Sequence, residues 1–342
     1  MQERQERRQI RTAVIGAGMI VPDFLEAAAL IPEISLYAIF GRPSSLEKLQ
    51  RMQKTYGFEK IYTDYEELLA DGEVDCVYIA LPNHLHYVYA KQALLARKDV
   101  ILEKPFTTSA KETAELFRVA EAQDRMIFEA ISNQYLPNFT KTAELLPKLG
   151  KIRLVQLNFS KRSSRYGAFQ QGEIHPVFDP KMGGGAVMDL NLYNIHMILG
   201  LFGSPREIHY YANLARGVDT SGMLILSYPD FVCVSQAAKD SDAPFEITIQ
   251  GEEGYLHADE PSNAYNSFRV VSGEGEAKEY ALNTGKPRLY YELRTFADLL
   301  GGREEETVRA RYQEISRHTQ AVQEVLDEAR RQAGILPERK DI

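Results

Sequence analysis

Two glycines separated by one residue, Gly16 and Gly18, follow a short apolar run at residues 11–15. Glycines in this position allow a tight turn and let backbone N–H groups approach a pyrophosphate at the start of a helix. Val21 stands where a third glycine is usual, so the helix should pack less closely on the strand. Many strand-to-helix turns contain glycine, but this one follows the first strand of an alternating pattern, which favours a dinucleotide site.

A second apolar run, residues 34–40, ends at Gly41 and Arg42 without an acidic residue. In dinucleotide-binding folds an Asp or Glu at this point accepts the ribose hydroxyls of NAD, whereas an arginine suits the 2′-phosphate of NADP. Ser44 and Ser45 add two hydroxyl groups beside the arginine. The pattern favours NADP and leaves NAD open. The alternative interpretation of Arg42 is an ordinary exposed loop arginine.

Two further strand ends carry polar side chains. Residues 75–81 lead into Pro82 and Asn83, and Asn83 is placed to cap the next helix. His86 would then lie above the strand ends, where ligands bind in open α/β sheets, or be a packed helix residue. Lys104 ends a fourth apolar run and would point toward the same crevice. Taken alone, Glu103 and Lys104 would more simply be a surface charge pair.

Such residues require strands that end at one edge of a sheet, and the first part of the chain provides them. Apolar runs alternate with helical patterns, for example Leu116, Val119 and Ala120 at i, i+3, i+4 spacing. This alternation predicts a doubly wound parallel sheet in an α/β fold. The expected strands are 11–15, 34–40, 75–81 and 99–102, and the expected helices are 23–30, 44–56, 65–70, 85–96 and 109–123.

After residue 132 the pattern changes to strands joined by short turns, which is typical of an antiparallel sheet. Pro229 suits the first central position of a hairpin turn at residues 228–231. One helix, 185–201, interrupts the strands. The other expected elements are strands 151–161, 207–214, 222–228, 231–236, 245–250, 255–258 and 268–271, a helix at 138–149 and two helices within 288–333.

Length and composition limit the function classes. The 342 residues are enough for about two domains, and 44% hydrophobic residues can bury a large core. Forty Lys+Arg against 48 Asp+Glu give a net charge of −8, so nucleic acids and anionic membranes are not expected partners.

No apolar stretch approaches the roughly 18 residues of a membrane span, and the charged N-terminus lacks the apolar segment of a secretory signal. Cys76 and Cys233 lie in apolar runs and are expected to be buried thiols in a reducing, cytoplasmic protein. The spacing of His, Cys and acidic residues shows no metal-ligand cluster, so no metal is expected.

Several motifs occur together and in order: the glycine turn, YTDYEELL at 62–69, the P-N-x-x-H of 82–86, the E-K-P of 103–105 and MGGGAVMDLNLYN at 182–194. Together they resemble the glucose–fructose oxidoreductase / inositol dehydrogenase (Gfo/Idh/MocA) family over residues 11–333. The resemblance implies a Rossmann domain followed by an α/β domain with a large open, mainly antiparallel sheet. The implied organisation is a polar tail at 1–10, a dinucleotide domain at 11–132, a substrate and oligomerisation domain at 133–287, and helices at 288–342 that return to the first domain.

The resemblance also implies a catalytic set. Lys104 matches the family's catalytic, cofactor-contacting lysine, and Tyr193 stands where many members have a histidine. A free tyrosine, with a pKa of ~10, is a poor base near neutral pH, and a nearby lysine lowers that value. Asp189, four residues before Tyr193, would share its helix face and bind substrate hydroxyls or tune the tyrosine. His196 is expected to be an interhelical histidine.

The implied cofactor contacts come from the four strand ends: Gly16, Gly18, Met19, Ile20, Gly41, Arg42, Leu81, Pro82, Asn83, His86, Glu103 and Lys104. The tyrosine at 193 and the runs 129–131 and 135–137 resemble the dimeric dihydrodiol dehydrogenase branch. Gln134 and Asn191 depart from it, because an arginine and a glycine are usual there.

We therefore expect an NAD(P)-dependent oxidoreductase acting on a secondary alcohol or carbonyl of a sugar, polyol or cyclic diol. The alternatives are a nicotinamide-binding sensor or co-repressor without turnover, and a redox-neutral NAD-dependent glycosidase. Residues 161–166 and 173–179 are candidate pocket loops or simply solvated segments. An open sheet with one wet apolar face needs cover, so a homodimer through the C-terminal sheet is expected.

Overall fold

The computed structural model describes residues 9–273 and 275–335, which group into two compact units. The first unit contains the residues up to Thr107 together with Lys111–Ala130 and Lys286–Arg317. The second contains Thr108–Ala110, Ile131–Gly285 and the residues from His318 onward. The chain therefore passes from one unit to the other five times. Most of the predicted N-terminal tail, residues 1–8, lies outside the described residues.

The first unit is a doubly wound parallel sheet, which confirms the predicted fold class. Its six parallel strands follow the order β3-β2-β1-β4-β5-β6. The order reverses between β1 and β4, and ligands of open α/β sheets bind beyond the carboxyl ends of the strands at such a point. The strands are β1 (Ile10–Ile15), β2 (Ile34–Phe40), β3 (Lys60–Tyr62), β4 (Cys76–Ile79), β5 (Asp99–Glu103) and β6 (Ile127–Ala130).

Helices connect these strands, and α4 packs on β4 and β5. The helices are α1 (Val21–Ala28), α2 (Leu46–Tyr56), α3 (Tyr65–Ala70), α4 (His86–Leu95), α5 (Ala110–Ala122), α9 (Tyr290–Gly301) and the first part of α10 (Glu306–Gln332). The C-terminal segment belongs here because α9 packs on α1 and because Phe296 stacks on Phe128 of β6.

The last helix is divided between the two units, whereas residues 288–342 were all expected to return to the first domain. Residues 306–317 of α10 group with the first unit, whereas its residues from His318 onward group with the second. The physical reason is length: 27 residues of α-helix extend for about 40 Å, which exceeds the width of one sheet.

The second unit contains an eight-stranded sheet in the order β14-β13-β12-β11-β7-β10-β9-β8. Neighbouring strands are antiparallel except β7 and β10, which confirms a mainly antiparallel sheet. The predicted hairpin joins β9 to β10, with the N–H of Tyr228 donating to the carbonyl of Phe231. The strands are β7 (Ile152–Ser160), β8 (Glu207–Ala215), β9 (Val218–Ser227), β10 (Val232–Ala238), β11 (Glu246–Gly251), β12 (Gly254–Ala258), β13 (Phe268–Ser272) and β14 (Lys278–Tyr280).

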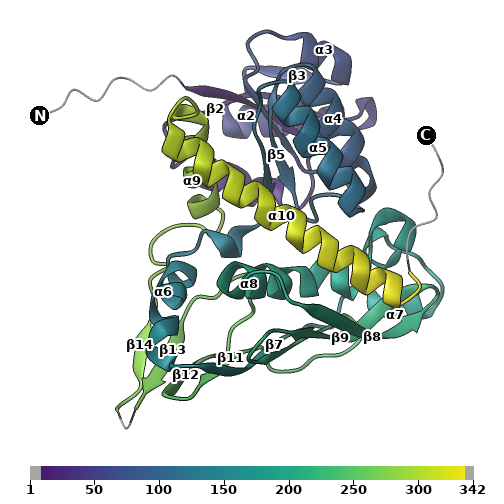
Figure 1. Ribbon diagram of the computed structural model, residues 1–342. Coiled ribbons are helices and arrows are strands. Elements are labelled where there is room, and N and C mark those ends of the chain that lie inside the picture. The colour runs from purple at the N-terminus through teal and green to yellow at the C-terminus, as the bar shows by residue number, and fades with distance from the viewer. Residues whose placement is uncertain (1–8, 274, 336–342) are drawn as a thin grey trace, which may run out of the picture. The chain divides into compact units, whose positions relative to one another are not determined.

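One face of this sheet is covered by α8 (Leu192–Phe202) and by the π-helical segment Val187–Asn191 that precedes it (Figure 1). The remaining helices are α6 (Pro137–Leu145) and the short α7 (Tyr166–Gln170). The prediction of a single α-helix over 185–201 is therefore wrong at its start, because the first turn is a π-helix. Such turns have i→i+5 hydrogen bonds and occur often at functional sites.

Candidate active site

The glycine turn after β1 is shaped for close approach. Gly16 has a φ of +106°, and a Cβ there would lie 2.5 Å from the carbonyl oxygen of Ala80, so only glycine fits. Gly18 is exposed, and a Cβ there would meet only that same oxygen at 3.8 Å. Met19, which follows, is 93% exposed. A narrow, accessible backbone turn leading into α1 fits the phosphates of a dinucleotide.

The end of β2 carries the cations expected for a phosphorylated ribose. The N–H of Gly41 donates to Tyr62, and the exposed Arg42 follows it at the start of a 3₁₀ turn, Pro43–Ser45. Lys48 of α2 donates through Nζ to the carbonyl of Ala17 within the glycine turn, at 2.5 Å. The sequence interpretation missed Lys48, although its place six residues after Arg42 on the next helix was a usable signal.

At the end of β4, His86 connects the loop after β4 to the loop after β5. Its Nδ1 lies 2.9 Å from the carbonyl of Pro105 and its Nε2 lies 2.8 Å from that of Leu81. Burial lowers the pKa of this histidine, although hydrogen bonds to the two carbonyls oppose the effect. His86 therefore holds the end of β4 against the end of β5. The prediction of Asn83 as a helix cap is wrong, because Asn83 lies inside a 3₁₀ turn, Asn83–Leu85, that precedes α4.

Lys104 follows β5, is half-buried and is joined to Pro105 by a cis peptide bond. Its neighbour Glu103 is fully buried, so the alternative of a surface charge pair is excluded. The Glu103 carboxylate accepts from the hydroxyl of Tyr78 at 2.6 Å and from the N–H of Lys104 at 3.2 Å. Glu103 thus fixes the backbone at the position from which the Lys104 side chain projects.

Two more buried glutamates, Glu129 of β6 and Glu292 of α9, lie behind this strand end. Burial raises the pKa of Glu103, and burial together with repulsion from Glu103 raises the pKa of Glu292 well above its usual value. Glu129 accepts a hydrogen bond from the N–H of Phe106. Glu292 was not predicted, because nothing local in α9 shows that this acidic residue faces inward.

Four strands that are neighbours in the sheet, β2, β1, β4 and β5, carry these residues. Parallel strands end at one edge, so the structure brings the glycine turn, the Arg42 loop, the Leu81–Pro82 turn and Lys104 to the same edge of the first unit. Ile20 immediately precedes α1 there. This edge fits a dinucleotide cofactor, which would be held by the glycine turn and, at its phosphorylated ribose, by Arg42 and Lys48.

In the second unit, Tyr193 lies in the first turn of α8 and is 7% exposed. Its backbone carbonyl accepts from Asn133 Nδ2 at 2.8 Å, and its ring packs in an aromatic cluster with Phe159, Tyr135 and Phe245. Lys104 belongs to the first unit and Tyr193 to the second. His196 lies deeper in α8, where its Nδ1 is 3.0 Å from His318 of α10, an interhelical contact.

Asp189 lies within the π-helical segment, and a third of its side chain is exposed. Asp189 precedes Tyr193 by four residues, and the π-helical segment gives way to α8 between them. Asp189 forms a 2.5 Å ion pair with Lys239, which follows β10. The sequence interpretation missed Lys239, because the two residues are fifty positions apart and only the sheet brings them together.

The two candidate pocket loops also reach this region. The N–H of Ser163 donates to the carbonyl of Lys239, and the carbonyl of Val177 accepts from both Lys239 Nζ and the N–H of Gly185. Residues 161–166 and 173–179 therefore flank the glycine-rich entry to the π-helical segment.

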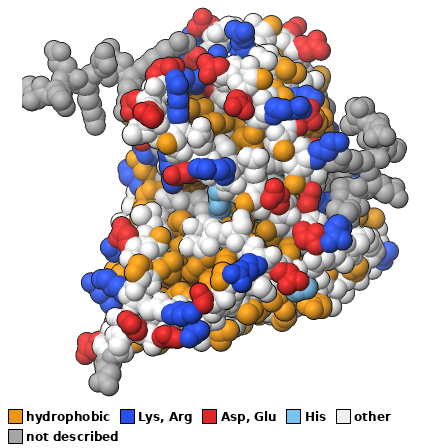
Figure 2. Space-filling model, in the orientation of Figure 1, with side chains coloured by type: hydrophobic (Ala, Val, Ile, Leu, Met, Phe, Trp, Pro, Cys, Tyr) orange, Lys and Arg blue, Asp and Glu red, His pale blue; other side chains and the backbone are white. Residues whose placement is uncertain are grey.

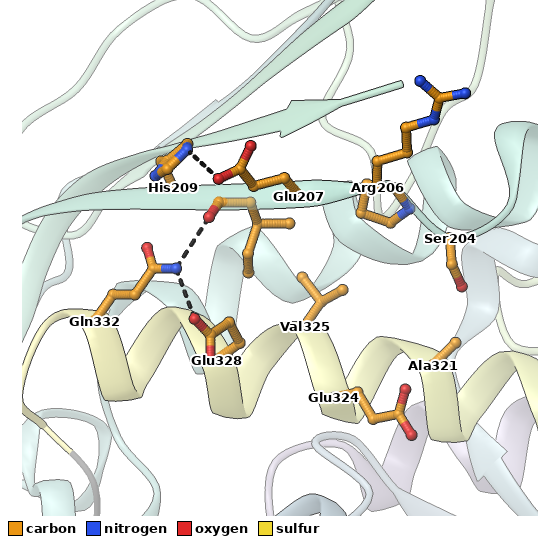
Figure 3. Close-up of a pocket in the computed structure, with 11 residues that line it drawn as sticks. Ser204, Arg206, Glu207, His209, Ala321, Glu324, Val325, Glu328 and Gln332 are labelled. Carbon is orange, nitrogen blue, oxygen red and sulfur yellow. Dashed lines mark hydrogen bonds and ion pairs between the residues drawn. The ribbon is translucent and has the colours of Figure 1, made fainter. Parts of the chain in front are cut away.

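A pocket of about 390 Å³ lies elsewhere in the second unit, between the start of β8 and α10 (Figure 3). Gln332 crosses it to the carbonyl of Ile208, and Glu207 pairs with His209. None of the predicted site residues lines it. Among the described residues, no group of three or more His, Cys, Asp and Glu side chains could hold a metal ion.

Comparison with known proteins identifies the family. Residues 10–131 match the model of an oxidoreductase family with an NAD-binding Rossmann fold, and residues 147–257 match the GFO/IDH/MocA C-terminal domain. The chain is 32% identical over 332 residues to the scyllo-inositol 2-dehydrogenase (NADP(+)) IolU of Bacillus subtilis, covering 96% of this chain and 98% of the relative. The chain belongs to the Gfo/Idh/MocA family of oxidoreductases. It is accordingly an NAD(P)-dependent oxidoreductase.

Other members of the family share most of the chain. A trans-1,2-dihydrobenzene-1,2-diol dehydrogenase of Danio rerio is 27% identical over 344 residues, with 96% of this chain and 98% of the relative covered. The 3-ketoreductase KijD10 of Actinomadura kijaniata, solved with NADP and TDP-benzene, has the same fold, with a TM-score of 0.80 at 23% identity, and 95% and 98% of the two chains are covered. No helix among the described residues is both long and apolar enough to span a membrane.

Proposed function

We propose that this oxidoreductase uses NADP to interconvert a secondary alcohol and a ketone in a polyol, sugar or cyclic diol. The named activities of the relatives support this substrate class, because they include an inositol dehydrogenase and dihydrodiol dehydrogenases. The observation that carries the proposal is the Asp189–Tyr193 stretch of the second unit, where a partly exposed carboxylate precedes a tyrosine at the start of α8.

The choice of NADP rests on charge at the end of β2. That strand end has no acidic side chain, and Arg42 and Lys48 supply two cations. A dianionic 2′-phosphate is favoured by such a pair, whereas the ribose diol of NAD needs a carboxylate acceptor.

The chemistry needs one proton transfer for each hydride that the nicotinamide accepts or donates. We assign the proton transfer to Tyr193, which would take the hydroxyl proton during oxidation and return it during reduction. Lys104 assists, because a lysine ammonium stabilises the phenolate form of a tyrosine. Asp189 would accept a hydrogen bond from a substrate hydroxyl and thereby orient the reacting carbon.

The test follows the absorbance of reduced nicotinamide. Purified protein is mixed with NADP⁺ or NAD⁺ and with pooled inositols, sugars and trans-diols, and Tyr193→Phe is measured in parallel. We expect turnover with NADP⁺ to exceed that with NAD⁺, and the variant to lose about 10²–10⁴-fold in kcat, the usual contribution of a general acid or base. Tyr280→Phe in β14 is the control for removal of a phenolic hydroxyl.

Cofactor binding, measured by NADPH fluorescence, separates the outcomes. If wild type and variant both bind NADPH and neither turns over any alcohol or ketone, the protein is a nicotinamide-binding sensor. Release of sugar from a glycoside without net NADP reduction would instead indicate a redox-neutral glycosidase.

We further propose that the protein is a cytoplasmic homodimer, paired through the eight-stranded sheet, with no nucleic-acid or membrane partner. Free, buried Cys76 and Cys233 support a reducing compartment, and the net charge of −8 disfavours polyanions.

A further inference from the structure

Lys239 is one of the largest fully buried side chains of the protein, with 2% of its surface exposed. An ammonium group removed from water is costly unless it is paired and hydrogen-bonded. Its backbone is held on both sides, because its N–H donates to the carbonyl of Thr220 and its carbonyl accepts from Ser163. The position of the charge at the end of β10 is therefore set by the sheet.

Two segments converge on the Lys239 ammonium. Nζ donates to Asp189 Oδ2 at 2.5 Å and to the carbonyl of Val177 at 3.1 Å, and it lies 5.0 Å from the centre of the Phe178 ring. The π-helical segment and the loop at 176–178 are thus both tied to one cation.

The surrounding titratable groups are consistent with a cation at this point. Asp219 of β9 is fully buried, and the Lys239 charge opposes the rise in the pKa of this carboxyl that burial causes. Burial lowers the pKa of the His175 imidazole, and the charges of Arg165 and Lys239 add to this effect. The Lys239 charge therefore acts on the buried carboxyl of Asp219 and on a histidine of a candidate pocket loop, besides its direct contact with Asp189.

We propose that Lys239 is a positioning residue for the reaction: it holds the Asp189 side chain in place and aims it, so that this carboxylate can accept a hydrogen bond from a substrate hydroxyl. The inference rests on the proposed function, because it assigns Asp189 to the substrate. Lys239 itself is buried and touches no substrate. Its effect on catalysis passes through Asp189 and through the backbone of Val177.

Lys239→Met tests this, because methionine has similar length and no charge. Removing a cation disfavours the charged form of a neighbouring carboxylate, so on the acidic side of the pH profile we expect kcat/KM of Lys239→Met to decline at higher pH than that of wild type. We expect kcat/KM at pH 8 to fall about 10–100-fold, the fold-change that the loss of one charge-assisted hydrogen bond corresponds to. The loss should be larger at pH 6. KM should rise more than kcat falls, because a substrate contact is weakened.

The decisive comparison is a cycle with Asp189→Asn, measured with whichever alcohol of the pool wild type oxidises fastest. In the Asp189→Asn background, Lys239→Met should cost no further activity and add no pH dependence. Circular dichroism of the double variant that combines Lys239→Met with Asp189→Asn, and so removes both charges, checks that the fold is kept. Lys181→Met, an exposed lysine of the same unit, controls for net charge.

The outcomes are distinct. Wild-type turnover with an unchanged Lys239→Met profile overturns the inference alone. Losses that multiply independently in the double variant also overturn it, because the two residues would then act separately. Absence of turnover in wild type defeats the proposed function and the inference together.

Discussion

At the scale of single residues, Asp219 shows how a buried carboxyl holds the candidate active-site helix. Its Oδ2 accepts from the N–H of Val187 and from the hydroxyl of Tyr210, both at 2.7 Å. Its Oδ1 has no hydrogen-bond partner among the described residues. Burial raises the pKa of Asp219 from 3.8 to about 6, because desolvation outweighs these hydrogen bonds. The start of the π-helical segment thus depends on a carboxyl that titrates near neutral pH.

This shift predicts a pH dependence of stability. A carboxyl whose pKa is higher in the folded than in the unfolded state destabilises the fold as pH rises from about 4 to 6, because the unfolded chain releases its proton first. The two values, 3.8 and about 6, correspond to about 3 kcal/mol in the free energy of unfolding. Asp219→Asn cannot titrate, so its stability relative to wild type should increase over this range.

Urea unfolding of both proteins at several pH values between 4 and 7.5 measures the effect. Comparing the two proteins cancels the titration of every other group. Parallel stability curves across this range would contradict the assigned pKa.

Single residues were predictable where their role is local. The turn at Gly16 and the place of Arg42 after β2 could be predicted, because a glycine turn and a strand end show in consecutive residues. Lys239 and Glu292 were not, because their partners come from distant segments and because a buried lysine or glutamate looks in sequence like a surface one. Local spacing in the sequence does not show which distant residues pair in the folded protein.

At the scale of elements, the entry to the π-helical segment requires glycine. Gly185 has a φ of +122°, and a Cβ there would overlap Oδ1 of Asp219. Its N–H also donates to Val177, which ties the candidate pocket loop to the helix start. Both the backbone conformation of Gly185 and the nearby Asp219 side chain therefore require glycine at this position.

We expect Gly185→Ala to lower the free energy of unfolding by more than the roughly 1–3 kcal/mol of backbone strain alone. Gly172→Ala is a matched control, because Gly172 has a φ of +102° and open space where its Cβ would be. The difference between the two variants in denaturant unfolding measures the overlap with Asp219. Equal destabilisation would show that Asp219 moves aside without cost.

Most elements were predicted because the longer strands and helices show a regular spacing of apolar residues in the sequence. β3 and β6 were not predicted, since a strand of three or four residues offers too few positions for a pattern. The π-helical turn was also beyond prediction, because its residues have the same apolar content as an α-helix. In the structure this segment has two long-range contacts, from Lys239 to the Asp189 side chain and from the N–H of Val187 to Asp219.

At the scale of the whole molecule, the eight-stranded sheet exposes an apolar face. Directly paired residues share a face, and the register places Tyr211 beside Met223 and Val232 beside Leu154. Tyr255 lies on the same face, one strand beyond Gln250. These five side chains are 41–66% exposed. Figure 2 shows hydrophobic side chains at the lower edge of the molecule, where Figure 1 draws the strands of this sheet.

The proposed homodimer predicts a particle of twice 38.8 kDa by light scattering at micromolar protein. Met223→Glu places a charge within the face and should shift the mass to the monomer. Leu30→Glu, an exposed leucine of the first unit, is the control for charge alone. A monomeric wild type would remove the proposed interface.

The alternation of the chain between units has a consequence for its synthesis. The parallel sheet of the first unit is complete in sequence at Ala130, but α9, which packs on α1, and Phe296, which stacks on Phe128, come only after residue 285. A ribosome adding roughly 5–20 residues per second needs on the order of 10–30 s to make the intervening segment. During that interval Phe128 and α1 lack these partners, so the dinucleotide domain gains its last packing contacts only when nearly the whole chain has been made.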